Sequence, residues 1–248
     1  MSDVRPTPLG YSVSTLPNGL RLVVHEDHST PIVGVNVWYH VGSKNEQPGK
    51  TGFAHLFEHM MFEGTPNAPK GLFSRVIQGG GGVDNGSTRY DYTNYIVTAP
   101  VSALEPVLWL EADRMRSLDI TAENLKNQKD VVKEEIRVNV KNRPYGLFFW
   151  TDISGLAFDK WENAHDGYGS FEDLDAAALE DVVVLDAHAW PHRAHRTGGG
   201  MPLLLLLETE SLADTSGYLH TRLAFHDFES GNASDSPSLF HQHVIHVD

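Results

Sequence analysis

The sequence contains no cysteine. Disulfide bonds, thiolate metal ligands and cysteine nucleophiles are therefore excluded. A metal ion bound to this protein must be held by histidine, aspartate or glutamate side chains. Candidate chemistry is thereby limited to nitrogen and oxygen donors.

Long apolar runs are also missing. No stretch approaches the roughly 18 apolar residues of a membrane-spanning helix, and the leucine run at residues 203–207 is far too short. The first ten residues, MSDVRPTPLG, lack the apolar core of a signal peptide. We therefore expect no membrane span and a cytoplasmic protein, or a periplasmic or secreted one if a leader has been removed.

Basic residues are scarce. Lysine and arginine number 19 against 33 aspartates and glutamates, which gives a net charge of -14 over 248 residues. This charge disfavours nucleic acid and anionic membranes as partners and suits a cationic peptide. Its simpler interpretation is that it keeps the protein in solution. The hydrophobic content of 40% is ordinary for a globular core.

The sequence pattern of the first hundred residues predicts both strands and helices. Asn18 and Gly19 between two apolar runs, residues 11–16 and 20–24, predict a hairpin, because Asn-Gly readily takes the positive φ angles of a tight turn. Alternation over residues 32–41 predicts a third strand with one buried face. The same reasoning predicts helices over residues 52–62 and 69–78, a glycine turn at 79–82 and a strand over 92–98.

Two helix-start signals follow. Ser102 and Glu105 have the spacing of a capping box, which predicts a helix over residues 103–117. Thr121 predicts the cap of a second helix over residues 123–140. Strands and helices interleave while the opening hairpin favours antiparallel pairing. We therefore predict an α+β fold, with an antiparallel sheet flanked by helices.

One constellation carries chemistry. His55, Glu58 and His59 stand at i, i+3 and i+4 of a predicted helix, so all three side chains project from one face. Two imidazoles one turn apart can both reach a zinc ion, while a third ligand must come from elsewhere. Glu58 then lies beside the metal and can act as general base toward a zinc-activated water.

The pattern H-x-x-E-H is the inverzincin signature. Taken alone it also fits a surface helix with two solvated histidines and a glutamate. The surrounding sequence decides between these interpretations, because it closely resembles the peptidase family M16 of pitrilysin, insulin-degrading enzyme and the mitochondrial processing peptidase. The resemblance covers roughly residues 10–182. It is carried by Gly42, Ser43, Glu46, the run GFAHLFEHMMFEGT (52–65), Gly82, Asn85, Thr88, Thr93, Tyr95, VVKEEIRVNVKNRPYG (131–146) and EDLDAAALEDV (172–182).

The resemblance implies a LuxS/MPP-like metallohydrolase domain and a Zn²⁺ cofactor held by His55, His59 and a glutamate on a later helix. Glu135 stands at the family's position for that glutamate, with Glu134 as its rival. Many relatives carry a further glutamate seven residues earlier, where this chain has Gln128. Gln128 is therefore predicted to lie next to a zinc ligand. It either replaces the glutamate as a hydrogen-bonding partner or orients that ligand more weakly than a glutamate would.

The resemblance also implies a peptide or unfolded-protein substrate, bound as an added strand along a sheet edge. The residues matching that edge are Gly82, Val83, Asn85, Gly86, Ser87 and Thr88. Family enzymes are chambers built from two halves. Because this chain matches only the zinc-bearing half, a second M16-like domain, subunit or copy is expected to complete it.

The resemblance stops near Val182, and eight of the 14 histidines lie beyond it. We predict a zinc-peptidase domain over residues 10–182 and an unassigned tail over 183–248, which a shifted reading frame or an incomplete domain would explain. Either could leave the sheet without a strand. The leading functional prediction is a zinc-dependent endopeptidase. The alternatives are a non-catalytic scaffold homologue and a truncated product that binds zinc without activity.

Overall fold

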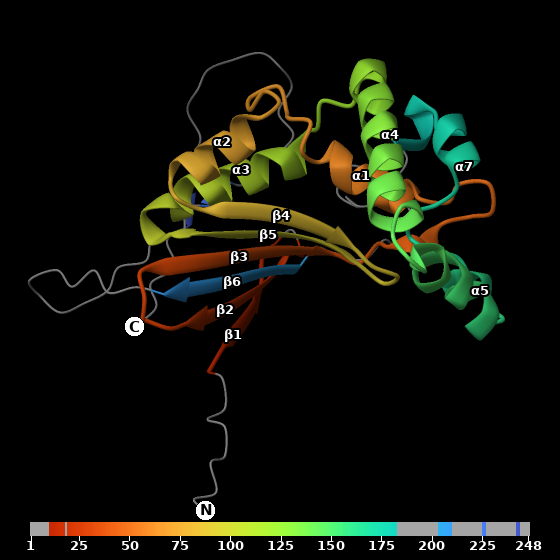
Figure 1. The fold of residues 1–248 in the computed structure, drawn as a ribbon. Helices are drawn as coiled ribbons and strands as arrows, with labels where there is room; N and C mark the ends of the chain where they lie inside the picture. Colours follow the sequence, from red (N-terminus) through yellow and green to blue (C-terminus); the bar gives the residue numbers. More distant parts are fainter. Residues whose placement is uncertain (1–9, 18, 183–202, 210–224, 227–241, 244–248) are drawn as a thin grey trace, which may run out of the picture. The chain divides into compact units, whose positions relative to one another are not determined.

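The computed structural model describes residues 10–17, 19–182, 203–209, 225–226 and 242–243 (Figure 1). Most of the predicted tail, including His241 and His246, lies outside the described residues, as does Asn18 of the predicted turn. Residues 1–210 and 211–248 form separate units. In the second unit, β7 (Phe225–His226) pairs antiparallel with β8 (Gln242–His243).

A six-stranded sheet organises the first unit, in the order β1-β2-β6-β3-β5-β4. Its strands are β1 (Ser12–Thr15), β2 (Arg21–Glu26), β3 (Ile32–Tyr39), β4 (Val83–Thr88), β5 (Thr93–Pro100) and β6 (Leu203–Thr209). Neighbouring strands are antiparallel except for the parallel pair β2 and β6. The predicted hairpin is present as β1 and β2, and β4 lies at a sheet edge.

Strand β3 shows why the sheet has one buried face. Its alternate residues Val33, Val35, Val37 and Tyr39 are at most 3% exposed, as the period-two pattern predicts. These side chains form a core with Tyr95 and Val97 of the neighbouring β5 and with the helices that cover the sheet. The predicted end at residue 41 is two residues too late, since β3 ends at Tyr39.

The helices follow the predicted segments within a few residues. The longer ones are α1 (Phe53–Met60), α2 (Leu72–Gly79), α3 (Leu104–Arg116) and α4 (Ala122–Ile136). Shorter turns are η1 (Ser43–Asn45), η2 (Val101–Ala103), the π-helical η3 (Arg137–Lys141) and η4 (Phe148–Asp152), α5 (Ile153–Ala157), α6 (Trp161–Ala164) and α7 (Phe171–Ala176). Among the described residues, none of these helices is both long and apolar enough to cross a membrane.

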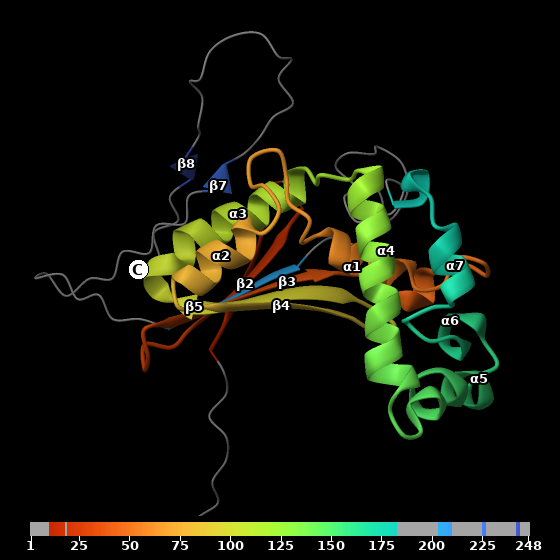
Figure 2. The same ribbon diagram turned by 45° about the horizontal axis from the view of Figure 1, so that its top comes forward.

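Helices α2 and α3 lie over one face of the sheet (Figure 2). Helix α1 packs against the edge strand β4 and against α4, which stands at one end of the sheet with α7 beside it. This mixed arrangement of helices and a mainly antiparallel sheet confirms the predicted α+β class. It also brings one face of α1, one face of α4 and the sheet edge together.

One local prediction was wrong. In the described part of the chain, no side chain caps α3, because residues 101–103 form the turn η2 and place Ser102 inside it rather than at the helix start. The leucine run, to which the sequence analysis assigned no element, forms β6 between β2 and β3.

Candidate metal centre

Helix α1 carries the motif and is almost completely buried. Seven of its eight residues, including His55 and Glu58, are buried, and His59 is partly exposed. The helix starts after Gly52, whose φ of 80° lies in the left-handed region. A side chain at Gly52 is excluded, because a Cβ there would come within 2.3 Å of the Tyr168 carbonyl oxygen. The segment around Tyr168 thus packs tightly on the start of the motif helix.

Glu46 caps this helix from outside it. One carboxylate oxygen accepts a hydrogen bond from the Gly52 N–H at 3.0 Å, and the other accepts from the Ala54 N–H at 2.9 Å. A carboxylate at a helix N-terminus also interacts favourably with the helix dipole. His165 lies 3.2 Å from Glu46, and the Trp161 ring stacks on His165 with centroids 4.4 Å apart. Burial raises the pKa of Glu46. The hydrogen bond between His165 and Glu46 raises the pKa of His165.

Helix α4 brings Glu135 to the two histidines. The His59 Nε2 lies 3.3 Å from the His55 Nε2 and 3.2 Å from a Glu135 oxygen, and the His55 Nε2 lies 3.7 Å from the same oxygen. Glu134 points away, is exposed and pairs with Arg137 at 2.9 Å. Of the two rival glutamates, the fold therefore brings Glu135 to the motif.

The three donor atoms fit a zinc ion. Two donors held about 2.0–2.1 Å from a tetrahedral zinc are separated by about 3.3 Å. The observed separations of 3.2, 3.3 and 3.7 Å lie close to this value. In the described part of the chain, these three residues are the group of histidine and acidic side chains able to hold a metal. Three protein donors leave one tetrahedral position for water or substrate.

The titration behaviour of the centre follows from its burial. Burial, with the neighbouring His59, lowers the pKa of His55 to about 4, so His55 is neutral and able to donate its lone pair to a metal. Burial also disfavours the charged form of His59, but the hydrogen bond and charge of Glu135 outweigh it and raise the pKa of His59. The same hydrogen bond lowers the pKa of Glu135, which keeps this carboxylate ionised.

Glu58 lies beside the three donors and is held from the sheet edge. The Thr88 hydroxyl donates a 2.6 Å hydrogen bond to one Glu58 oxygen. Gly86 leaves room for the other oxygen, because a Cβ there would lie 2.8 Å from it. Burial raises the pKa of Glu58. A carboxylate whose pKa is raised is a better proton acceptor and suits a general base.

Gln128 contacts His59 from behind. Its side-chain oxygen lies 3.2 Å from the His59 Nδ1, and its amide nitrogen donates to Glu63. Glu63 is 2% exposed and accepts a 2.6 Å hydrogen bond from Lys70. Sequence reasoning singled out Gln128 but missed Glu63. The signal was its place inside the motif run 52–65, where a charged residue follows apolar ones directly after the helix.

The predicted substrate edge borders this centre. Val83, Asn85, Gly86, Ser87 and Thr88 all lie in β4, whereas Gly82 precedes the strand. A hollow of about 280 Å³ separates the edge from α1 and α4. Its lining residues are His55, Glu58, His59, Phe62, Asp84, Asn85, Gly86 and Glu135. Phe62 and Asp84 were not predicted as site residues, although Asp84 lies within the predicted edge.

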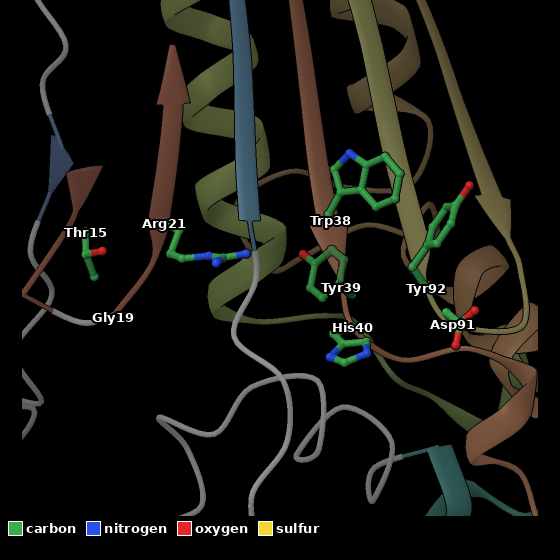
Figure 3. Close-up of a pocket in the computed structure, with 8 residues that line it drawn as sticks. All are labelled: Thr15, Gly19, Arg21, Trp38, Tyr39, His40, Asp91 and Tyr92. Carbon is green, nitrogen blue, oxygen red and sulfur yellow. The ribbon is translucent and has the colours of Figure 1, made fainter. Parts of the chain in front are cut away.

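A larger hollow of about 590 Å³ lies away from the motif (Figure 3). It is lined by Thr15, Gly19, Arg21, Trp38, Tyr39, His40, Asp91 and Tyr92. The rings of Trp38 and Tyr92 lie 4.2 Å apart there. This hollow contains none of the predicted site residues. We therefore assign the chemistry to the smaller hollow, where the metal donors converge.

Comparison with known proteins agrees with this geometry. The sequence model of the insulinase family, peptidase family M16, matches residues 21–147. The chain belongs to peptidase family M16. Among curated relatives of this M16 chain, the zinc protease PqqE of Helicobacter pylori is 38% identical over 137 residues, which are 55% of this chain and 31% of PqqE. Subunit 1 of the rat mitochondrial cytochrome b-c1 complex is 32% identical over 51% of this chain and 26% of its own length.

Solved structures resemble the M16 chain over more of its length. A protease from Helicobacter pylori, 29% identical, covers 82% of this chain with a TM-score of 0.73, and the match spans 47% of that protease. Pitrilysin matches with a TM-score of 0.69 at 16% identity, over 82% of this chain and 21% of the pitrilysin chain. At this identity, the match shows a shared fold only. The chain thus spans less than half the length of each of these four proteins.

Proposed function

We propose that this chain is the zinc-bearing part of a metalloendopeptidase. The single observation that carries the proposal is the arrangement of His55, His59 and Glu135 around one point, with Glu58 beside them. When bound there, zinc supplies Lewis-acid chemistry, because it acidifies a water and polarises a peptide carbonyl. Glu58, held by Thr88 and with a raised pKa, takes the proton from the water and returns it to the leaving amine.

The substrate proposal rests on β4. This strand has one partner, β5, in the described sheet, and its other side borders the hollow. An extended peptide can add to such an edge through backbone hydrogen bonds. We propose that Val83, Asn85, Gly86, Ser87 and Thr88 bind a peptide in this way, with Gly82 at the entrance to the strand.

Zinc content tests the metal site. Elemental analysis of the purified chain should give about one zinc per chain, the stoichiometry of a site with three protein ligands. His59→Ala and Glu135→Gln should each lose it, whereas the matched control Glu134→Gln should keep it, because Glu134 is exposed and pairs with exposed Arg137. A zinc-free, well-folded wild type would overturn the metal site.

Cleavage of an unfolded peptide tests the catalytic role. Glu58→Gln should keep the zinc and lose activity by at least about 100-fold, as expected when a general base is removed. A chelator should abolish the activity of the wild type. Equal activity of wild type and Glu58→Gln would contradict the assignment of Glu58 as the base.

We further propose that a second M16-like domain or subunit completes the active site. The support is that the chain spans only 47% of the Helicobacter pylori protease that it resembles. If a second copy can take that place, cleavage per chain should rise with protein concentration. Full activity of a monomer at high dilution would contradict the need for a partner.

A further inference from the structure

A chain of hydrogen bonds runs from the metal centre to the protein surface. The His59 Nδ1 meets the Gln128 oxygen at 3.2 Å, the Gln128 amide nitrogen donates to one oxygen of Glu63, and Lys70 donates to the other at 2.6 Å. We propose that Glu63, acting through Gln128, selects the tautomer of His59 that presents its Nε2 to the metal. This inference rests on the proposed zinc site and makes Glu63 a positioning residue.

The direction of the Gln128 side chain decides the tautomer. A glutamine amide has one accepting oxygen and one donating nitrogen, whereas an ionised carboxylate can only accept. Because Glu63 accepts, the nitrogen of Gln128 must face Glu63 and its oxygen must face His59. The His59 Nδ1 must then carry a proton. The Nε2 faces the Glu135 carboxylate, which also attracts a proton to it in the metal-free centre, so the proton that a metal ion would displace is the one on the Nε2. This is the nitrogen that lies near His55 and Glu135.

Burial makes this choice firm. Glu63 is 2% exposed and Gln128 is 8% exposed, so water has little access to replace either partner. Two buried groups that cannot hydrogen-bond to each other, such as two acceptors, both lose their hydration without compensation. Lys70, half exposed, compensates the charge of Glu63 from the solvent side. Reversing the Gln128 amide would place two acceptors together at Glu63.

His55 provides an internal contrast. Its Nδ1 is buried and has no hydrogen-bond partner among the described residues. Ligand histidines usually donate their second nitrogen to a carboxylate, carbonyl or water, which fixes the ring. In the described part of the centre, support of this kind reaches the histidine pair through His59 alone. Among the described residues, the Glu63–Gln128 pair therefore orients the one histidine whose second nitrogen has a partner.

The pair also constrains which residue can stand at position 128. A glutamate there could still accept from His59, but its second oxygen would face the Glu63 carboxylate, and two buried carboxylates in contact repel each other. The conflict disappears if residue 63 becomes an amide, because Glu63→Gln supplies an NH₂ group that donates to the new carboxylate. The two positions should therefore be coupled, with the double substitution restoring what one single substitution destroys.

A double-mutant cycle on zinc affinity tests this coupling. Competition against a chromophoric chelator should show Gln128→Glu binding zinc about 10- to 100-fold more weakly, the usual cost of losing such a support. Glu63→Gln should change affinity by less than about threefold, because its amide oxygen can still accept from Gln128. The double variant should return to within about threefold of the wild type. Asn127→Glu is the matched control, since it adds the same charge at an exposed position of the same helix.

The tautomer itself gives a readout that does not depend on zinc or on activity. In zinc-free Glu135→Ala protein labelled with ¹⁵N-histidine, the carboxylate that competes for a proton on the Nε2 is absent. At alkaline pH, where the imidazole is neutral, His59 should then carry its proton on Nδ1. Its signals can be assigned by their absence from His59→Ala. Gln128→Leu, which removes both the acceptor and the donor, should shift His59 toward the mixture of tautomers seen in a free imidazole.

The outcomes separate this inference from the proposed function. A His59 protonated on Nε2 in the Glu135→Ala background, or a double variant as weak as Gln128→Glu, would overturn the role of Glu63 even if zinc binds and peptides are cleaved. Conversely, a wild type that binds no zinc, together with the expected Nδ1 proton in Glu135→Ala, would overturn the metal site and leave the role of Glu63 in setting the tautomer supported. Thermal melting of each zinc-free variant identifies any loss of affinity that comes from unfolding.

Discussion

Helices α1 and α4 both contribute donors to the metal centre, yet they are fixed in the fold in different ways. Helix α1 has eight residues, seven of them buried, and its first N–H groups are capped by Glu46 from outside the helix. Helix α4 has fifteen residues, four of them buried, and the hydroxyl of its own Thr121 accepts from the Asn124 N–H.

The difference shows which interactions hold each metal donor in position. A helix of two turns is not stable alone in water, so α1 depends on tertiary contacts. The buried residues of α4 recur every three or four positions, and its cap is local, so its own sequence specifies most of its structure. His55 and His59 should therefore respond to changes far away in the sequence, whereas Glu135 should respond mainly to changes within α4.

Of the substitutions that test this difference between α1 and α4, Glu46→Gln should have the largest effect on stability and on zinc affinity. The amide can accept only one of the two N–H hydrogen bonds at the start of α1, and it loses the charge that faces His165. We expect the free energy of unfolding to fall by about 2 to 3 kcal/mol, the cost of unsatisfied buried groups. Zinc affinity should fall as well. Urea unfolding and chelator competition measure the two effects, and an unchanged zinc affinity would show that α1 does not need this cap.

His165→Gln should produce a smaller effect that depends on pH. The hydrogen bond to Glu46 raises the pKa of His165 above its ordinary 6.5. Protonated His165 thus stabilises the fold below pH 6.5, and this contribution is lost as the pH rises through the folded-state pKa. In zinc-free protein, the variant should be less stable than the wild type by about 1 to 2 kcal/mol near pH 6, the range for a hydrogen bond to a charged group.

The two proteins should differ less as the pH rises through the folded-state pKa of His165, because His165 then becomes neutral in the wild type. Urea unfolding of both proteins over a series of pH values from about 6 upward gives the comparison. Since His55 and His59 titrate in both proteins, the difference between them isolates His165. A difference that does not vary with pH would mean that His165 acts through packing with Trp161 rather than through its charge.

Thr121→Ala should produce the smallest effect. Loss of the N-cap of α4 costs about 1 kcal/mol of stability. Because the cap lies at the far end of the helix from Glu135, zinc affinity should stay within experimental error. A fall in zinc affinity as large as that of Glu46→Gln would remove the distinction between the two helices.

The same distinction explains what the sequence could predict. His55, Glu58 and His59 could be placed together because their relation is the local geometry of one helix. The position of Glu135 came from family resemblance, since nothing local links residues 59 and 135. Glu63 was missed because its role depends on a partner that only the fold brings near, and Asp84 was missed because only the fold places it at the hollow.

Strand β6 was missed for a different reason. Five consecutive leucines show no alternation, and a short run of one apolar residue type fits a buried helix segment equally well. The glycines and histidines around the run gave no turn pattern to set its bounds. The failed capping box at Ser102 is of the same kind, because η2 inserts a turn that the spacing of Ser102 and Glu105 does not reveal.

The place of β6 in the sheet also sets the order in which the protein can be completed during synthesis. Strands β2 and β3 are neighbours in the sequence, but β6 stands between them and is translated after the whole metal centre. Until residues 203–209 leave the ribosome, β3 exposes an unpaired edge and the β1–β2 hairpin has no place in the sheet. The nascent chain thus passes through a stage with all of its proposed zinc donors present and its sheet still open, the stage at which a chaperone would be needed most.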